Sequence, residues 1–205
     1  CGDGFLGGPE ADALRQRVLD AWRAGGLSPG EVQGGSHPRG DHPDAPRSDE
    51  FCYLDCTSGD SGDALADFLT RLDRLVLALA RQVGALSAQK LVRGSPMATV
   101  YATVGSRYCP HFDAQGNNGR KLTCIIYLNP SWQEAHGARL RLWPQAHGLL
   151  PEGECVCVDP LHGRLLVFLA DGQNLHEVRP LEGAEPRLAL SCWYYHEGAL
   201  ASVER

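Results

Sequence analysis

The feature that most constrains the fold is a change of residue pattern at Gly94. Beyond it, short runs rich in β-branched and aromatic residues alternate with turn residues, which is typical of strands. Runs of helix followed by many short strands, rather than alternating with them, predict an α+β fold. We expect the strands to close into a double-stranded β-helix, or jelly roll. The expected strands cover residues 98–104, 122–128, 139–143, 164–168 and 188–195.

Two helices are expected before Gly94. From Pro9 to Ala24 the apolar residues recur at spacings of three and four, and a pair of glycines follows. A longer apolar stripe runs from Ser61 to Ala85 and predicts a helix that backs the core. Its apolar members are Leu65, Phe68, Leu69, Leu72, Leu75, Val76, Leu79 and Val83.

The segment between these helices, from Leu27 to Glu50, is dense in Gly, Pro, Ser and Asp. With almost no apolar anchor, it is expected to be an exposed, mobile loop, and its location within a long hairpin is left open. We therefore expect one domain over residues 1–205: helical support over 1–95, a flexible loop at about 25–50, and a jelly-roll core over 96–205 that carries the site.

Composition limits the partners. The net charge is -6, and no block of Lys or Arg exceeds two neighbours, which argues against a nucleic-acid surface. The longest apolar run, from Leu75 to Ala80, is far shorter than the roughly 20 residues of a membrane span.

No long apolar stripe is left unassigned once the helices pack, so we expect a monomer. Because numbering opens at Cys1 without signal-peptide features, we interpret the chain as a trimmed catalytic domain.

Eight cysteines in 205 residues are a modest density, which favours reduced thiols over a disulfide framework. Two cysteine pairs, Cys52 with Cys56 and Cys155 with Cys157, are candidates for the two halves of a zinc site. Their spacings differ from the usual zinc pair, and the two pairs lie about 100 residues apart. We therefore interpret them as structural or surface thiols.

A metal site is indicated by His111 and Asp113, which lie two residues apart. On an extended strand both side chains would project from one face and bind one ion. His176 follows near the last strands and would complete a triad of two histidines and one carboxylate, the geometry of non-haem Fe(II) oxygenases. The similar pattern at His42 and Asp44 is rejected, because it lies in the Pro- and Gly-rich loop.

Arg187, at the start of the final apolar strand, is the second indication. A buried arginine is costly without a partner, whereas its planar fork binds a carboxylate through two charge-assisted hydrogen bonds. It therefore predicts a dicarboxylate ligand. The alternative is an ordinary surface ion pair with Glu182 or Glu185.

At these residues the chain resembles the cytoplasmic prolyl 4-hydroxylases of the oxygen-sensing type, which include the hypoxia-inducible-factor prolyl hydroxylases. These belong to the Fe(II)- and 2-oxoglutarate-dependent dioxygenases, whose core is jelly-roll and cupin-like. The N-terminal third matches only in its helix, loop, helix outline. The resemblance rests on residues 97–101, 108–113, 119–132, 140–144, 175–180 and 187–194.

The resemblance implies a role for each matching residue. His111, Asp113 and His176 would bind Fe(II), while Arg187 and Tyr127 would bind the distal carboxylate of 2-oxoglutarate. Tyr101 would lie near the iron-proximal end of this co-substrate, and its other neighbours would be Met97, Ile125, Leu140 and Ser191. The substrate side would comprise Tyr108, Arg120 and Trp193. For the aliphatic residues plain core packing is an alternative, as is a solvated charge for the arginine.

The resemblance also implies an activity. The chain would hydroxylate a prolyl residue of an intracellular protein with Fe(II), 2-oxoglutarate and O₂, supported by ascorbate, and produce succinate, CO₂ and 4-hydroxyproline. It would act in the cytoplasm, and in the nucleus as well, with a link to oxygen sensing, and the loop from Leu27 to Glu50 would close over the peptide. Two alternatives remain: a 2-oxoglutarate oxygenase for another substrate class, such as a free amino acid or another side chain, and a non-catalytic jelly-roll binding module.

Overall fold

The computed structural model describes residues 1–31, 40, 42, 45–55, 63–86, 90–114, 118–144, 153–170 and 172–199. The helices are α1 (Gly8–Arg23), α2 (Ala64–Ala80) and the short 3-10 helix η1 (Glu134–His136). The strands are β1 (Ser28–Pro29), β2 (Glu50–Tyr53), β3 (Leu91–Arg93), β4 (Met97–Tyr101), β5 (Tyr108–His111), β6 (Arg120–Tyr127), β7 (Leu140–Trp143), β8 (Val156–Val158), β9 (Leu165–Leu169), β10 (Leu175–Val178) and β11 (Arg187–His196).

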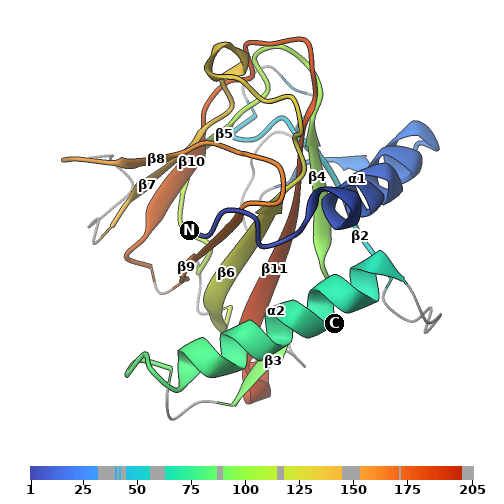
Figure 1. The fold of residues 1–205 in the computed structure, drawn as a ribbon. Coiled ribbons are helices and arrows are strands. Elements are labelled where there is room, and N and C mark those ends of the chain that lie inside the picture. Colours follow the sequence, from blue (N-terminus) through green and yellow to red (C-terminus); the bar gives the residue numbers. More distant parts are fainter. Residues whose placement is uncertain are drawn as a thin grey trace.

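The strands form two antiparallel sheets. The larger has the order β1-β2-β4-β11-β6-β9, with β3 also paired to β11, and the smaller has the order β5-β10-β7-β8. The sheets share one apolar cluster, in which Ile125 and Ala189 of the larger sheet pack with Leu140 and Leu142 of the smaller. This helix-backed pair of sheets agrees with the predicted α+β fold (Figure 1).

The larger sheet has two different faces, because successive side chains of a strand point in opposite directions. On β11, Leu188 and Leu190 belong to the helix-side core. Their neighbours Arg187, Ser191 and Trp193 line a pocket on the opposite face. The strands β4 and β6 alternate in the same way, so a single sheet carries both the packing core and one wall of the pocket.

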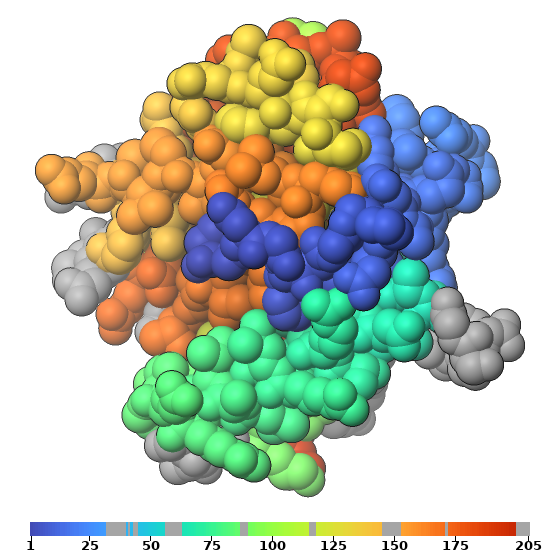
Figure 2. Space-filling model, in the orientation of Figure 1, coloured from blue at the N-terminus to red at the C-terminus, as the bar shows by residue number. Residues whose placement is uncertain are grey.

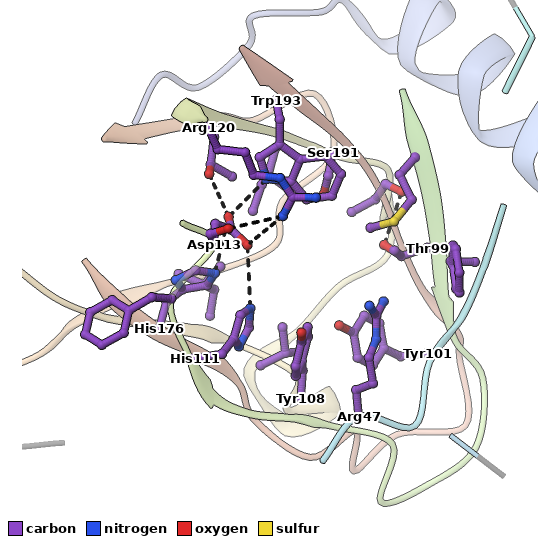
Figure 3. Close-up of a pocket in the computed structure, with 18 of the residues that line it drawn as sticks. Arg47, Thr99, Tyr101, Tyr108, His111, Asp113, Arg120, His176, Ser191 and Trp193 are labelled. Atoms are coloured by element: carbon purple, nitrogen blue, oxygen red, sulfur yellow. Dashed lines mark hydrogen bonds and ion pairs between the residues drawn. The ribbon is translucent and has the colours of Figure 1, made fainter. Parts of the chain in front are cut away.

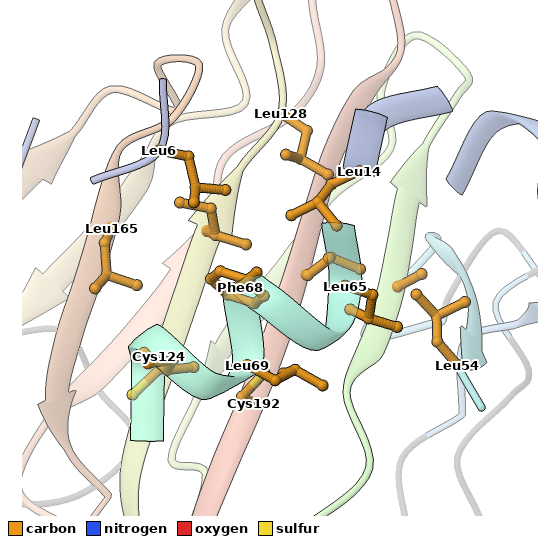
Figure 4. Packing of buried hydrophobic residues seen from close by; sticks show 14 of the residues in the cluster. Leu6, Leu14, Leu54, Leu65, Phe68, Leu69, Cys124, Leu128, Leu165 and Cys192 are labelled. Carbon is orange, nitrogen blue, oxygen red and sulfur yellow. The ribbon is translucent and has the colours of Figure 1, made fainter. Parts of the chain in front are cut away.

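Helix α2 lies across the larger sheet and buries its apolar stripe there (Figure 1). Phe68 and Leu69 pack in one cluster with Cys124 of β6 and Cys192 of β11 (Figure 4). The helix begins at Asp63, whose carboxylate accepts a hydrogen bond of 3.0 Å from the amide of Leu65 and so satisfies a free donor of the first turn. None of the described helices combines the length and apolar character needed to cross a bilayer.

The helical expectations need one correction. Helix α1 lies where predicted, but α2 ends at Ala80 rather than Ala85. The chain turns over residues 81–86, where Gly84 interrupts the helical pattern. The predicted stripe ran on into this turn because Val83, its last member, also packs against the core.

The expectation of an exposed loop over 25–50 is wrong for the part near β2. Ala45, Arg47 and Asp49 are buried. The antiparallel pairing of β1 with β2 at the two ends of this segment agrees with the long hairpin that the sequence left open. The two charges are buried together, with Arg47 Nε donating to Asp49 Oδ1 at 2.7 Å, which offsets the cost of removing them from water. Residues 32–39, 41 and 43–44, which include part of the rejected His42 and Asp44 pattern, lie outside the described residues.

Replacing Leu72 by Ala is expected to lower the free energy of unfolding by about 2–5 kcal/mol, because this side chain is fully buried between α2 and the sheet. Leu77→Ala on the same helix is the matched control, since Leu77 is 54% exposed, and a change within about 0.5 kcal/mol is expected there. Urea unfolding measures both. Equal losses in the two variants would contradict the packing of α2 described above.

Candidate active site

The pairing of β10 with β5 brings three predicted metal ligands together. His176 stands opposite His111 in the register of the two strands, and their ring centroids are 4.2 Å apart. Asp113 lies in a bend just after β5, not on the strand itself as expected. Its carboxylate oxygens are 3.8 Å from His111 Nε2 and 3.7 Å from His176 Nε2. One ligand atom of each residue lies within 4.8 Å of the others, close enough to share an ion.

Both imidazole rings are held by backbone carbonyls. His111 Nδ1 lies 2.8 Å from the carbonyl oxygen of Cys109, and His176 Nδ1 lies 3.0 Å from that of Asn174. A carbonyl oxygen only accepts hydrogen bonds, so the proton of each neutral ring is placed on Nδ1. The lone pair on each Nε2 is therefore directed at the space beside Asp113 (Figure 3).

The carboxylate of Asp113 is fixed by two donors to the same oxygen. Thr123 Oγ1 donates to Oδ2 at 2.6 Å, and Trp193 Nε1 donates to it at 3.1 Å. Burial tends to raise the pKa of this carboxyl, but His176, His111, Arg120 and the Thr123 hydrogen bond outweigh it and hold the pKa below its usual range. Burial and the neighbouring His176 lower the pKa of His111. At neutral pH the site thus offers a carboxylate and a neutral His111 imidazole, the forms that bind a metal.

This donor set fits ferrous iron. Two imidazole nitrogens and one carboxylate oxygen leave several coordination positions open, which is the arrangement of non-haem Fe(II) oxygenases. Around it, Tyr108 stacks on His111 with ring centroids 3.6 Å apart, and Phe168 contacts the edge of His176. These aromatic contacts restrict the ligand rings to the orientation that faces Asp113.

The other end of the pocket holds Arg187, which is only 3% exposed. Its Nε donates to the carbonyl oxygen of Ala138 at 3.2 Å, and its guanidinium lies 4.9 Å and 5.1 Å from the ring centroids of Tyr101 and Tyr127. No acidic side chain of the described chain forms an ion pair with it, so the expected alternative of a bridge to Glu182 or Glu185 is wrong.

The hydroxyl of Tyr127 is a second unsatisfied donor beside Arg187. It is buried and, among the described residues, has no hydrogen-bond acceptor. Burial raises the pKa of Tyr127 to about 12, so the group keeps its proton at neutral pH. A buried cation and a buried hydroxyl without an acceptor are costly in an empty pocket and fit an anionic ligand. The carboxylate of a small dicarboxylic acid would satisfy both.

A pocket of about 270 Å³ joins the two ends (Figure 3). All the predicted site residues line it except Tyr127, which lies behind Arg187. The co-substrate walls are Met97, Ile125, Leu140, Tyr101 and Ser191, while Tyr108, Arg120 and Trp193 lie near the metal ligands. The size suits a small acid, since it falls just below the roughly 300–1,000 Å³ of drug-sized sites.

Sequence reasoning missed Thr123 and Arg47. Thr123 Oγ1 forms the shortest hydrogen bond to the Asp113 carboxylate. The guanidinium of Arg47 lies 4.7 Å from the ring centroid of Tyr108 and lines the same pocket (Figure 3). Thr123 could have been predicted from Ile125 and Tyr127, because residues two apart on a strand share a face and all three lie on β6. No sequence pattern identified Arg47 as a pocket residue, since it lies within the segment expected to be an exposed loop.

Comparison with known proteins agrees with this geometry. The model of the 2OG-Fe(II) oxygenase superfamily matches residues 96–195. The human prolyl hydroxylase EGLN3 is 31% identical over 205 residues, covering 99% of this chain and 80% of the relative. The hypoxia-inducible factor prolyl hydroxylase of Caenorhabditis elegans is 28% identical over 94% of this chain and 26% of its own length.

Solved structures give the same assignment. A Trichoplax adhaerens prolyl hydroxylase in complex with a peptide fragment of the hypoxia-inducible factor oxygen degradation domain has a TM-score of 0.78 and 27% identity, covering 100% of this chain and 86% of that one. A Pseudomonas putida prolyl-4-hydroxylase has a TM-score of 0.72 and 26% identity, with coverages of 94% and 89%. These likenesses confirm the predicted jelly-roll core.

The chain therefore belongs to the 2OG-Fe(II) oxygenase superfamily and, within it, to the family of the EGLN prolyl hydroxylases. Members of this superfamily use Fe(II), 2-oxoglutarate and O₂, as predicted. The buried guanidinium of Arg187, the Tyr127 hydroxyl without an acceptor among the described residues, and the His, Asp, His cluster are the features of this chain that fit these cofactors.

Replacing Thr123 by Val is expected to weaken Fe(II) binding by about 10- to 100-fold, because the isosteric side chain no longer donates to Asp113. Anaerobic calorimetric titration without 2-oxoglutarate measures the effect. Thr99→Val is the control, since Thr99 lines the same pocket but donates to the backbone oxygen of Ala189. The assignment fails if the two variants weaken iron binding equally.

Proposed function

We propose that this chain is a prolyl 4-hydroxylase that uses Fe(II), 2-oxoglutarate and O₂ to hydroxylate a prolyl residue of a protein, producing succinate, CO₂ and 4-hydroxyproline. The observation that carries the proposal is one pocket with a facial triad at one end and, at the other, a buried Arg187 that forms no ion pair with an acidic side chain of the described residues. Membership of the EGLN family supports the prolyl substrate.

Iron is proposed to be held by His111, Asp113 and His176; when bound, it supplies the redox chemistry that couples oxidation of 2-oxoglutarate to hydroxylation. Arg187 and Tyr127 bind the distal carboxylate, the first through its charge and the second through its hydroxyl proton. Two anchors at one end fix the direction in which the dicarboxylate enters and place its other end beside the triad.

The walls between the two ends position the co-substrate. Met97, Ile125 and Leu140 supply apolar contacts for its methylene groups and exclude water, while Tyr101 and Ser191 complete the lining. Tyr101 stands opposite Arg187 in the register of β4 and β11, so its ring supports the guanidinium directly. This contact lies at the end that binds the distal carboxylate, so it gives no support to the expected role of Tyr101 near the iron-proximal end, which stays a proposal.

The target peptide is proposed to contact Tyr108, Arg120 and Trp193. Arg120 lies 4.0 Å above the Trp193 ring and donates to the backbone oxygen of Asp113, so it sits directly beside the metal ligands. Tyr108 covers the opposite side of His111. The Trichoplax adhaerens relative binds a peptide fragment, which supports a protein substrate for this chain too.

Further parts of the proposal concern the whole chain. We propose that residues 1–205 act as one catalytic domain, which the packing of α1 and α2 on the pocket-bearing sheet supports. The net charge of -6 supports a protein partner rather than nucleic acid or a membrane surface. A monomer acting in the cytoplasm or nucleus, with ascorbate in support, remains our expectation.

The test follows succinate after O₂ is admitted to the chain with Fe(II) and 2-oxoglutarate, in the presence of proline-containing peptides or the same peptides with alanine in place of proline. We expect succinate formation stimulated by the prolyl peptides alone, and a product heavier by one oxygen atom on proline. Succinate that no prolyl peptide stimulates would contradict the proposed substrate while leaving the oxygenase in place.

His176→Ala should abolish turnover in this assay. Loss of a residue that supports a metal ligand lowers metal affinity or activity by about 10- to 100-fold, and loss of the ligand itself lowers them at least as much. His196→Ala is the matched control and should keep wild-type turnover, because His196 is exposed at the end of β11. Turnover that survives in His176→Ala would overturn the assignment of the triad.

A further inference from the structure

Cys155 and Cys157 lie outside the active site, on the hairpin of β7 and β8, which projects from the body of the protein (Figures 1 and 2). Their sulfur atoms are 3.9 Å apart. Residues two apart on an extended chain share a face, and Val158, which follows Cys157, points the other way, into the core between the sheets. The two thiols therefore lie together on the outer face, with Cys157 exposed and Cys155 half-buried.

The sulfur separation matches a metal chelate. Two thiolates bound at about 2.3 Å to a tetrahedral ion stand about 3.8 Å apart, so Cys155 and Cys157 need almost no movement to share one. A disulfide would require the sulfurs to close to about 2.05 Å. An extended strand keeps the Cα atoms of residues two apart about 6.6 Å from each other, which is near the upper limit of the Cα–Cα distances that a disulfide spans.

The groups around the pair act on its thiols in opposite directions. Arg141 of β7 stands directly opposite Cys157 in the register, and it lies 3.5 Å from Glu177 of β10 on the same outer face. Partial burial and the neighbouring Cys157 thiol raise the pKa of Cys155, while the positive charge of Arg141 acts in the opposite direction. Two adjacent thiolates repel each other, and a shared cation removes that repulsion.

We propose that Cys155 and Cys157 form a second metal site, which binds a thiophilic cation of the Zn(II) class. Soft sulfur ligands distinguish it from the nitrogen and oxygen donors of the triad, so the two sites select different ions. Within the described part of the chain no third His, Cys, Asp or Glu joins the pair. The remaining coordination positions are therefore open to water, a small thiol or a second molecule.

The experiment titrates the reduced 205-residue chain with Co(II) under anaerobic conditions and follows absorption. Thiolate ligation to Co(II) gives an intense charge-transfer band in the near ultraviolet, which imidazole and carboxylate ligands do not give. We expect this band in the wild-type chain, and we expect Zn(II) to abolish it by displacement. Its complete loss is expected in the Cys155→Ser, Cys157→Ser double variant.

Two controls separate this site from the others. Cys1→Ser removes another exposed thiol and should keep the band, as should His176→Ala, which disables the proposed iron site. The weaker visible absorption of Co(II) at the triad should persist in the double serine variant and so report that it folds. The proposal is overturned by a band that survives in that variant, by no band in the wild type, or by a purified chain in which the two cysteines are already a disulfide.

Discussion

The site depends on one strand register. β10 pairs with β5 on one side and β7 on the other, and in this register His176 stands opposite His111. A slip of one residue would turn His176 to the outer face, where Glu177 now lies, and no ligand pair would form. The burial of Val178, which shares the face of His176, helps to specify the register, because the slip would also turn this apolar side chain to the outer face.

The larger sheet imposes a complementary constraint at the other end of the pocket. Arg187 opens β11, and the alternation of that strand gives one face to the helix-side core and the other to the pocket. The burial of its guanidinium without a carboxylate is a cost of folding that a bound dicarboxylate would offset. The protein thus keeps both ends of its pocket prepared before ligands arrive: oriented imidazoles at one end and unsatisfied donors at the other.

Much of this was predictable from the sequence. The period of three to four in α1 and α2 and the short β-runs after Gly94 gave the fold class, and the spacing of His111, Asp113 and His176 gave the metal cluster. Short strands such as β8 and β10 were not among the expected strands, because three or four residues carry too little periodicity.

Other features depended on tertiary contacts. The burial of Arg47 and Asp49 results from a local ion pair and two aromatic rings, Phe51 and Tyr108, which no linear pattern reveals. The proximity of the Cys155 and Cys157 sulfurs likewise required the strand conformation of β8. Their sequence spacing alone suggested only surface thiols.

The most direct test of the central claim compares 2-oxoglutarate with pyruvate, which has the same 2-oxo acid group but lacks the distal carboxylate, in calorimetric titrations of the Fe(II)-loaded chain without O₂. Arg187→Gln should weaken 2-oxoglutarate binding by about 10- to 150-fold, the loss of one charge-assisted pair of about 1.5–3 kcal/mol, and leave pyruvate binding unchanged. Equal weakening of both ligands would mean that Arg187 supports the fold of the pocket rather than the far carboxylate, and would contradict the account.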